Sequence, residues 1–166
     1  MSNKQQIYWF YKADKLNKIE IEYRFSSFFF TPTIFHLKQH KGSVLLYLFW
    51  YIFSFGRYKI FYIMENETNK MAHFSNIIPK IFKYSFMGRK HIQIVNCYTL
   101  PLFRGCRLFS LALSVIGEEF KNTVVWVGSR EDNVGSIKSI KRAGYKMVAR
   151  VYKTKFLGIY KLIEDE

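Results

Sequence analysis

Polar and apolar residues alternate along several short segments of the chain, which predicts β-strands. In residues 18–25 (KIEIEYRF) every second side chain is apolar or aromatic and the intervening ones are charged, so we expect a half-buried strand. Residues 58–64 (YKIFYIM) and 71–75 are also typical of strands, and the polar residues 65–69 between them predict the turn of an antiparallel hairpin. Residues 91–99 (HIQIVNCYT) are rich in β-branched and aromatic side chains and predict another strand.

The second half of the chain has a helical period and recognisable helix ends. Apolar side chains in residues 107–120 recur every three or four positions, which predicts an amphipathic helix. Residues 123–127 (TVVWV) form a continuous apolar run, typical of a strand that is covered on both faces. Either Asp132 or Asn133 can cap a following helix, and Gly144 stands where a left-handed C-terminal cap belongs.

The remaining segments complete the expected organisation. Residues 145–152 and 156–163 predict two further strands, whereas residues 28–42, around Pro32, show no regular period. No internal repeat, Gly-Ser linker or low-complexity tract interrupts the 166 residues, of which 49% are hydrophobic. That content is sufficient for one core, so we expect a single mixed α/β domain over residues 1–166.

The longest apolar run of the sequence covers residues 44–55. A membrane-spanning helix needs about 20 apolar residues, so this shorter run favours a buried helix. Basic residues on both sides, Lys41, Arg57 and Lys59, keep open the alternative of a segment that lies on a membrane surface. For the aromatic residues of this run, core packing is the favoured explanation.

Positive charge is the strongest compositional signal, because the net charge is +14. No acidic residue lies between Glu67 and Glu118, and a region of one sign attracts polyanions such as nucleic acid or a phosphorylated cofactor. Aromatic rings beside a lysine in residues 8–12 (YWFYK) are compatible with a platform for single-stranded nucleic acid. No RNP-like, zinc-finger or helix-turn-helix pattern accompanies them, so a nucleic-acid partner rests on charge alone. The basic residues of the acid-free region are Lys70, Lys80, Lys83, Arg89, Lys90, Arg104 and Arg107.

The two cysteines, Cys97 and Cys106, make neither a metal-ligand set nor a disulfide framework. We interpret both as reduced thiols and expect no metal site. Residues 1–14 lack the apolar core and small-residue cleavage site of a signal peptide. A cytoplasmic protein is therefore expected.

The segment of residues 98–113 (YTLPLFRGCRLFSLAL) joins the end of a predicted strand to the start of a predicted helix. The turn between them carries Arg104, Gly105, Cys106 and Arg107 at the helix N-terminus, where backbone N–H groups have no intrahelical partner. Such an end favours phosphate, and two guanidinium groups add charge-assisted hydrogen bonds. Gly105 allows a ligand to approach the backbone closely.

Residues 98–107 resemble the pyrophosphate-binding motif of the GNAT superfamily of acyl-CoA N-acyltransferases, in which a strand leads through proline into an Arg-Gly loop that opens a helix. Residues 133–137 (NVGSI) and 141–145 (KRAGY) are similar to that family's Asn-x-x-Ser-Ile helix and its Gly-aromatic end. Residues 124–127 occupy the place of the family's fifth strand.

The resemblance covers about residues 58–163 and leaves residues 1–57 as a divergent N-terminal portion. It implies an α/β (α+β) fold with a mixed, mostly antiparallel central sheet flanked by helices, and acetyl-CoA as the acyl-CoA co-substrate. The residues that it assigns to the pantetheine arm, through their backbone, are Cys97, Tyr98 and Thr99. Those that it assigns to the diphosphate are Arg104, Gly105, Cys106 and Arg107, with Leu108 and Phe109 as backbone donors. It assigns Asn133 to the pantetheine or thioester end.

The chain departs from the family motif Arg/Gln-x-x-Gly-x-Gly/Ala at two positions. Arg107 stands at the first small-residue position and Phe109 at the second. A bulky side chain there would crowd the diphosphate, although Arg107 could add its own charge. A third departure is Ile140, where many members carry a tyrosine that protonates the leaving thiolate.

The catalytic residues remain unassigned from the sequence. Tyr145, Tyr98 and Cys97 carry ionisable protons, but no motif supports any of them as the acid. For the base, His91 and His73 can titrate in a useful range, and Glu65 and Glu67 lie in the predicted turn. For each of these four residues an ordinary surface role is the favoured explanation, so no base is assigned.

The favoured function is that of an N-acetyltransferase that uses a primary amine as acceptor. Loose similarity to GNAT-like proteins encoded with bacterial surface-polysaccharide genes suggests an amino sugar. Two alternatives stay open, namely a basic nucleic-acid-binding module and a catalytically degenerate GNAT fold that acts as a binding protein.

Overall fold

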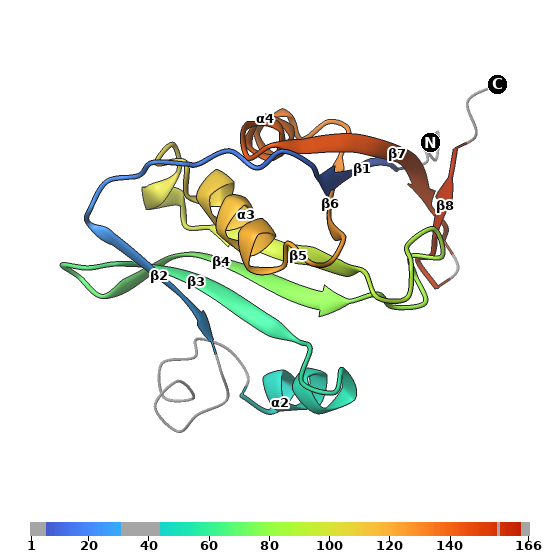
Figure 1. The fold of residues 1–166 in the computed structure, drawn as a ribbon, viewed down its shortest axis with the longest axis horizontal. Helices are drawn as coiled ribbons and strands as arrows, with labels where there is room; N and C mark the ends of the chain where they lie inside the picture. Colours follow the sequence, from blue (N-terminus) through green and yellow to red (C-terminus); the bar gives the residue numbers. More distant parts are fainter. Residues whose placement is uncertain (1–5, 31–43, 156, 164–166) are drawn as a thin grey trace.

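The computed structural model describes residues 6–30, 44–155 and 157–163, and within these ranges the chain forms an eight-stranded sheet with helices on both faces (Figure 1). The strands are β1 (Ile7–Ala13), β2 (Phe25–Phe30), β3 (Lys59–Glu65), β4 (Lys70–Pro79), β5 (Ile92–Thr99), β6 (Val125–Arg130), β7 (Tyr145–Lys153) and β8 (Tyr160–Leu162). The helices are α2 (Val44–Phe53), the short 3₁₀ turn η1 (Pro101–Phe103), α3 (Leu108–Glu119) and α4 (Val134–Arg142).

The sheet is mixed and mostly antiparallel, with the strand order β2-β3-β4-β5-β6-β1-β7-β8. Among the described strands every neighbouring pair is antiparallel except β5 and β6, which run parallel and are connected through α3. A parallel pair needs such a crossover, because a tight turn cannot bring the chain back to the starting end of the sheet. The expected fold class is confirmed, including the antiparallel hairpin of β3 and β4.

Strand β1 lies in the middle of the sheet, between β6 and β7. Its sequence, IYWFYKA, is apolar at consecutive positions because both faces are covered: Phe10 and Tyr11 point to opposite faces and both are buried. The segment of residues 8–12 therefore does not present a row of rings to single-stranded nucleic acid.

Helices α3 and α4 cover one face of the sheet, and α2 lies on the opposite side of it (Figure 1). The largest core cluster lies under α3 and α4, where Leu113 and Ile116 of α3 pack with Ile94 of β5 and Val127 of β6. On the other face, one cluster gathers beneath α2, and a second joins residues 81–87 to β1 and β6.

The ends of α4 are formed as the sequence predicts. Asn133 caps the helix, since its Oδ1 accepts a hydrogen bond from the Ser136 backbone N–H at 3.1 Å. Gly144 follows the helix with φ +92°, and a Cβ at this position would lie 2.0 Å from the Lys15 carbonyl oxygen. Both the backbone angle and the close approach of the chain require glycine here.

The prediction of a strand over residues 18–25 is wrong, because only Phe25 belongs to a strand. The alternation places Tyr23 on the face of Phe25, yet its side chain is 95% exposed. The chain before it is held by α3 and α4 instead of a neighbouring strand: the Asn17 N–H donates to the Ala143 carbonyl, and Ser114 Oγ donates to the Asn17 carbonyl at 2.6 Å. Alternation indicates a strand only where a partner strand is available.

The helix in the apolar run 44–55 is confirmed as α2, but the prediction that it is buried is wrong. Within α2 only Tyr47 is buried, and it packs against Phe30 of β2 at a ring distance of 4.8 Å. No described residue covers the opposite side of the helix. In the described ranges no helix combines the length and apolar character needed to span a membrane.

Some element bounds differ from those expected. β6 begins at Val125 and continues to Arg130, because its end pairs with β1, while β8 is only Tyr160–Leu162. Residues 28–30, expected to be irregular, belong to β2, where they pair with β3. The rest of the irregular prediction, residues 31–42, lies outside the described residues.

Candidate functional site

Strands β5 and β6 separate toward their carboxyl ends. They pair only from Ile92–Val125 to Ile94–Val127, after which residues 95–99 and 128–130 have no ladder contact with one another. A β-bulge accompanies the separation, because the register of β5 on β4 shifts next to Asn96, whose φ is +49°. The edge of β5 that faces β6 is thereby left without a partner strand.

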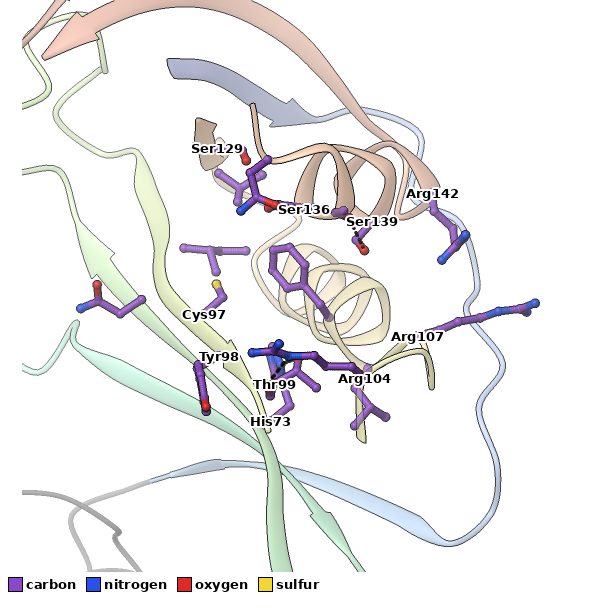
Figure 2. Close-up of a pocket in the computed structure, with 18 of the residues that line it drawn as sticks. His73, Cys97, Tyr98, Thr99, Arg104, Arg107, Ser129, Ser136, Ser139 and Arg142 are labelled. Carbon is purple, nitrogen blue, oxygen red and sulfur yellow. Dashed lines mark hydrogen bonds between the residues drawn. The ribbon is translucent and has the colours of Figure 1, made fainter. Parts of the chain in front are cut away.

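A cavity of about 1010 Å³ occupies this opening and extends to the N-terminus of α3 (Figure 2). Residues 94–99 of β5 and 127–130 of β6 form its walls, together with one side of α4 along its whole length, from Gly135 to Arg142. The loop between η1 and α3 closes one end, and Tyr8 of β1 also lines the cavity.

The loop end of the cavity is rich in hydrogen-bond donors. In the described part of the chain, the backbone N–H groups of residues 105–110 have no hydrogen-bond acceptor. Gly105 has φ +90°, and a Cβ built on it would meet no atom within 4 Å, so the space in front of the loop is open. Arg107 at the N-cap takes φ +58°, a left-handed conformation that favours glycine.

Three arginines, Arg104, Arg107 and Arg142, line the same end of the cavity and are exposed. Arg104 Nε donates to the Thr99 carbonyl at 3.5 Å, whereas Figure 2 shows Arg107 and Arg142 reaching outward together, from the start of α3 and the end of α4. No aspartate or glutamate is among the described residues that line the cavity. Free N–H groups and guanidinium groups without a neighbouring carboxylate favour a phosphate ligand.

A buried histidine of β4, His73, pairs with Thr99 of β5. His73 is fully buried; its Nδ1 lies 2.7 Å from Thr99 Oγ1 and its Nε2 lies 2.8 Å from Ser75 Oγ. Burial lowers the pKa of His73 to about 4, so the ring is neutral near pH 7. A neutral imidazole donates to one hydroxyl and accepts from the other. The Phe109 ring of α3, which also lines the cavity, lies 5.8 Å from this imidazole.

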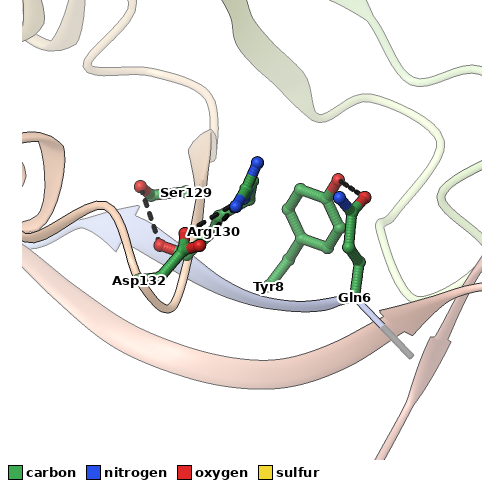
Figure 3. Close-up of polar contacts among 5 residues, drawn as sticks. All are labelled: Gln6, Tyr8, Ser129, Arg130 and Asp132. Carbon is green, nitrogen blue, oxygen red and sulfur yellow. Dashed lines mark hydrogen bonds and ion pairs between the residues drawn. The ribbon is translucent and has the colours of Figure 1, made fainter. Parts of the chain in front are cut away.

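The end of the cavity away from the loop is polar, and two of its side chains, Tyr8 and Arg130, are held by contacts with neighbouring residues (Figure 3). The Tyr8 hydroxyl donates to Gln6 Oε1 at 2.9 Å. Arg130, which pairs with Tyr8 across the β1–β6 ladder, forms an ion pair with Asp132. The hydrogen bond from Arg130 holds the pKa of the Asp132 carboxyl below its usual range.

No protein-family model and no curated protein matches the sequence. Solved structures of N-acetyltransferases do match the fold. A GCN5-related N-acetyltransferase from Sphaerobacter thermophilus aligns with a TM-score of 0.63 at 11% identity, over 89% of this chain and 50% of that one. A GNAT-family acetyltransferase from Colwellia psychrerythraea aligns with a TM-score of 0.57 at 13% identity, over 88% of this chain and 54% of that one. A GCN5-related N-acetyltransferase from Kribbella flavida aligns with a TM-score of 0.56 at 10% identity, over 96% of this chain and 62% of that one.

The chain has the GNAT fold. The resemblance noticed in residues 98–107 and 133–145 is thereby confirmed at the level of the fold, and the low identities fit a divergent sequence. The chain spans about half the length of the first two structures.

Within this GNAT fold, nine of the ten residues expected at the cofactor line the cavity. The nine are Cys97, Tyr98, Thr99, Arg104, Gly105, Arg107, Leu108, Phe109 and Asn133. The side chain of the tenth, Cys106, faces away, and its Sγ accepts a hydrogen bond from Arg24 at 3.8 Å. Burial raises the pKa of Cys97 to about 12, so its side chain stays a thiol near neutral pH.

The structure separates the acid and base candidates. His91 Nδ1 accepts hydrogen bonds from the Trp126 indole and the Gly88 N–H, and Glu65 accepts from Thr68; neither residue lines the cavity. Among the four base candidates only His73 does.

The acid candidates separate in the same way. Tyr145 is buried, and its hydroxyl donates to the Leu113 carbonyl at 3.0 Å. Ile140, at the position where a tyrosine was expected in the family, is fully buried in the core. Tyr98 does line the cavity and is partly exposed, so it is the remaining phenol of the three proton-bearing candidates.

Sequence reasoning missed Tyr8 and Arg142 as cavity residues. Tyr8 reaches the cavity only because β1 inserts beside β6, and no local signal in the sequence indicates that pairing. Arg142 was noted only as part of the motif that closes α4. Asn133, an expected cofactor residue, caps the N-terminus of the same helix, and this link was the signal in the sequence that could have pointed to Arg142.

Proposed function

We propose that the protein is an acyl-CoA-dependent N-acyltransferase that transfers an acetyl group from acetyl-CoA to a primary amine. One observation carries the proposal: a single cavity connects the loop before α3, with its free backbone N–H groups, to the unpaired edge of β5. The first feature suits a diphosphate, and the second suits an arm with amide groups that can hydrogen-bond to a strand edge.

The two departures from the family motif are compatible with this ligand. Arg107 keeps the left-handed backbone that a glycine would adopt, and its side chain points outward from the loop (Figure 2). Phe109 lines the cavity without filling it, since about 1010 Å³ remains open. The residues present therefore fit acetyl-CoA.

In the proposed complex the loop N–H groups, with Arg104 and Arg107, hold the diphosphate, and the backbone of residues 97–99 orients the pantetheine arm. Acetyl-CoA supplies an activated thioester when bound. The protein's contribution is mainly to hold amine and thioester together, which can lower a barrier by about 7–11 kcal/mol. The polar end around Tyr8 and Ser129 is where an amine acceptor would meet hydrogen-bonding groups.

The amine must reach the thioester without its extra proton. No described carboxylate lines the cavity, and His73, with a pKa of about 4, is a weak base that two hydroxyls already engage. We therefore propose that the acceptor loses its proton to solvent before attack. The rate should rise with pH until the pKa of the amine is reached.

The acceptor belongs to the same proposal. The resemblance to proteins of surface-polysaccharide synthesis favours an amino sugar, and the lack of acidic side chains among the described lining residues favours an acceptor that carries negative charge elsewhere, such as a nucleotide-linked amino sugar.

The first test is thermal unfolding with and without acetyl-CoA. Ligand at about 100 times its dissociation constant adds about 2.7 kcal/mol of stability, hence about 5–10 °C for a chain of this size. Arg104→Ala should lose most of this rise, and Arg89→Ala, an exposed arginine outside the cavity, should keep it. No rise in the parent protein would refute the cofactor site.

The second test is release of free CoA thiol in the presence of a panel of primary amines that includes amino sugars. Turnover that Arg104→Ala abolishes supports an enzyme. A thermal rise without turnover on any amine would instead support the alternative of a binding protein with the GNAT fold.

A further inference from the structure

Helix α2 exposes an entirely apolar face. The ten residues of the helix, VLLYLFWYIF, contain no charged side chain. Tyr47 points into the protein, where its ring lies 4.8 Å from Phe30 and 5.4 Å from Tyr58. The side chains that α2 and the following turn expose are Leu45, Leu46, Phe49, Ile52, Phe53 and Phe55.

These exposed positions form one stripe. Within the helix they are spaced i, i+1, i+4, i+7 and i+8 from Leu45, which places them on a single helical face. Leu45 is 80% exposed, Ile52 71% and Phe55 93%. Scattered apolar side chains are normal on a protein surface, but a contiguous set of this kind marks an interaction site.

Positive charge lies directly beside this stripe. A second cavity, of about 200 Å³, is lined by Phe53 and Phe55 together with Arg57, Lys80 and Arg89. No acidic residue is among its described lining residues. An anionic group in this cavity would meet three cations and, at the same time, lie next to apolar side chains.

We propose that the exposed face of α2 and this basic cavity form a docking surface for membranes that contain anionic phospholipid. The apolar side chains enter the boundary between headgroups and acyl chains, and Arg57, Lys80 and Arg89 contact the lipid phosphates. This combination of an apolar face and flanking cations is the one that interfacial helices use. A helix of ten residues is about 15 Å long, half of a bilayer core, so it lies in the interface.

Charge favours a membrane over a second copy of the chain. A symmetric dimer through this face would bring the same three cations of both copies together, in a protein whose net charge is already +14. Like charges in one interface oppose association, whereas an anionic membrane neutralises them.

Docking through α2 is compatible with use of the larger cavity. α2 lies on the opposite side of the sheet from α3 (Figure 1), and no residue of α2 lines the cavity between β5 and β6. The docking surface does not depend on the proposed acetyl transfer, so its test needs no acetyl-CoA.

The test is co-sedimentation of the protein with vesicles of phosphatidylcholine alone and with vesicles of equal parts phosphatidylcholine and phosphatidylglycerol. We expect binding to the second kind only, weakened by added salt. Arg57→Gln with Arg89→Gln should reduce the partition coefficient about fivefold for each charge removed. Leu45→Gln with Ile52→Gln should reduce it by about tenfold or more, because two apolar side chains no longer enter the interface.

Matched controls carry the same changes elsewhere. Lys121→Gln with Lys138→Gln removes two exposed charges near α3 and α4, and Met147→Gln with Leu162→Gln removes two exposed apolar side chains of β7 and β8. Both controls should bind like the parent protein. All four variants change exposed residues, and their unfolding temperatures should match the parent within about 2 °C.

Three results would overturn the proposal. The parent protein could fail to bind the anionic vesicles, or the control pairs could weaken binding as much as the test pairs, which would indicate attraction by net charge only. The third is a dimer in solution that Leu45→Gln with Ile52→Gln dissociates, which would assign this face to a second copy of the chain.

Discussion

Replacement of Gly105 by alanine tests whether the space in front of the α3 loop is open for a ligand. Gly105 has φ +90°, and a left-handed backbone costs a residue with a side chain about 1–2 kcal/mol. No atom lies within 4 Å of the new Cβ, so packing adds nothing to that cost. We therefore expect Gly105→Ala to lower the unfolding temperature by about 2–8 °C and to leave the fold intact.

Gly144→Ala is the matched comparison, because Gly144 has nearly the same φ, +92°, but its Cβ would lie 2.0 Å from the Lys15 carbonyl oxygen. A real contact at this distance forces the backbone to move, so this variant should lose clearly more stability than Gly105→Ala. Urea unfolding of both variants, under identical conditions, measures the two costs.

The affinity for acetyl-CoA should fall more in Gly105→Ala than in Gly144→Ala, although Gly144→Ala loses more stability. The methyl group of Gly105→Ala stands in the open space beside the free N–H groups of the loop, where it would push the diphosphate away from them. We expect the affinity for acetyl-CoA to fall by about tenfold for each 1.4 kcal/mol by which this displacement weakens binding. A Gly105→Ala variant as unstable as Gly144→Ala would show that the loop is packed. Undiminished stabilisation by acetyl-CoA in Gly105→Ala would show that the diphosphate lies elsewhere.

Three further predictions concern the same elements. Arg107→Gly should stabilise the protein by up to about 1 kcal/mol, because it relieves the left-handed strain at φ +58°, while it weakens acetyl-CoA binding by removing a positive charge; unfolding with and without ligand measures both. Asn133→Ala should cost about 1 kcal/mol, since the α4 cap to Ser136 is removed, and Asn133→Asp should retain most of it in the same assay. His73 has a folded pKa of about 4 against about 6.5 unfolded, so between these values the unfolded chain binds more protons and the free energy of unfolding falls as pH decreases, by up to about 3 kcal/mol. A chemical-denaturation series over this pH range should show the fall in the parent protein and a smaller one in His73→Gln; equal slopes would contradict the burial argument.

Much of the site could be predicted from the sequence because its parts are local. The apolar period of α3, the proline and glycine of the preceding turn, and the Asn133 cap all act within a few residues of chain, and each appears in the structure where the sequence places it. Arg107 is a further local feature. The family motif has a small residue at this position, and although this chain has an arginine, its backbone takes the left-handed conformation that favours glycine.

The interpretation of the N-terminal segment and of the base candidates could not come from the sequence. Whether residues 8–12 form a platform or a central strand depends on pairing with β6 and β7, more than 100 residues away. His73 and His91 are equivalent as sequence, since both lie near strand ends. Only the order of the strands brings one beside Thr99 at the cavity and the other against Trp126 outside it.

The sequence by itself determined the elements with local signals and the fold class that they imply, because helix periods, caps and turns depend on neighbours in the chain. Tertiary structure alone decided what each apolar surface meets. Residues 18–25 alternate like a strand but find no partner strand, and α2 is as apolar as a buried helix, although the described residues cover it on one side only. The hydrophobic pattern of a segment shows that its apolar side chains tend to leave water. Only long-range packing determines which other surface of the protein buries them.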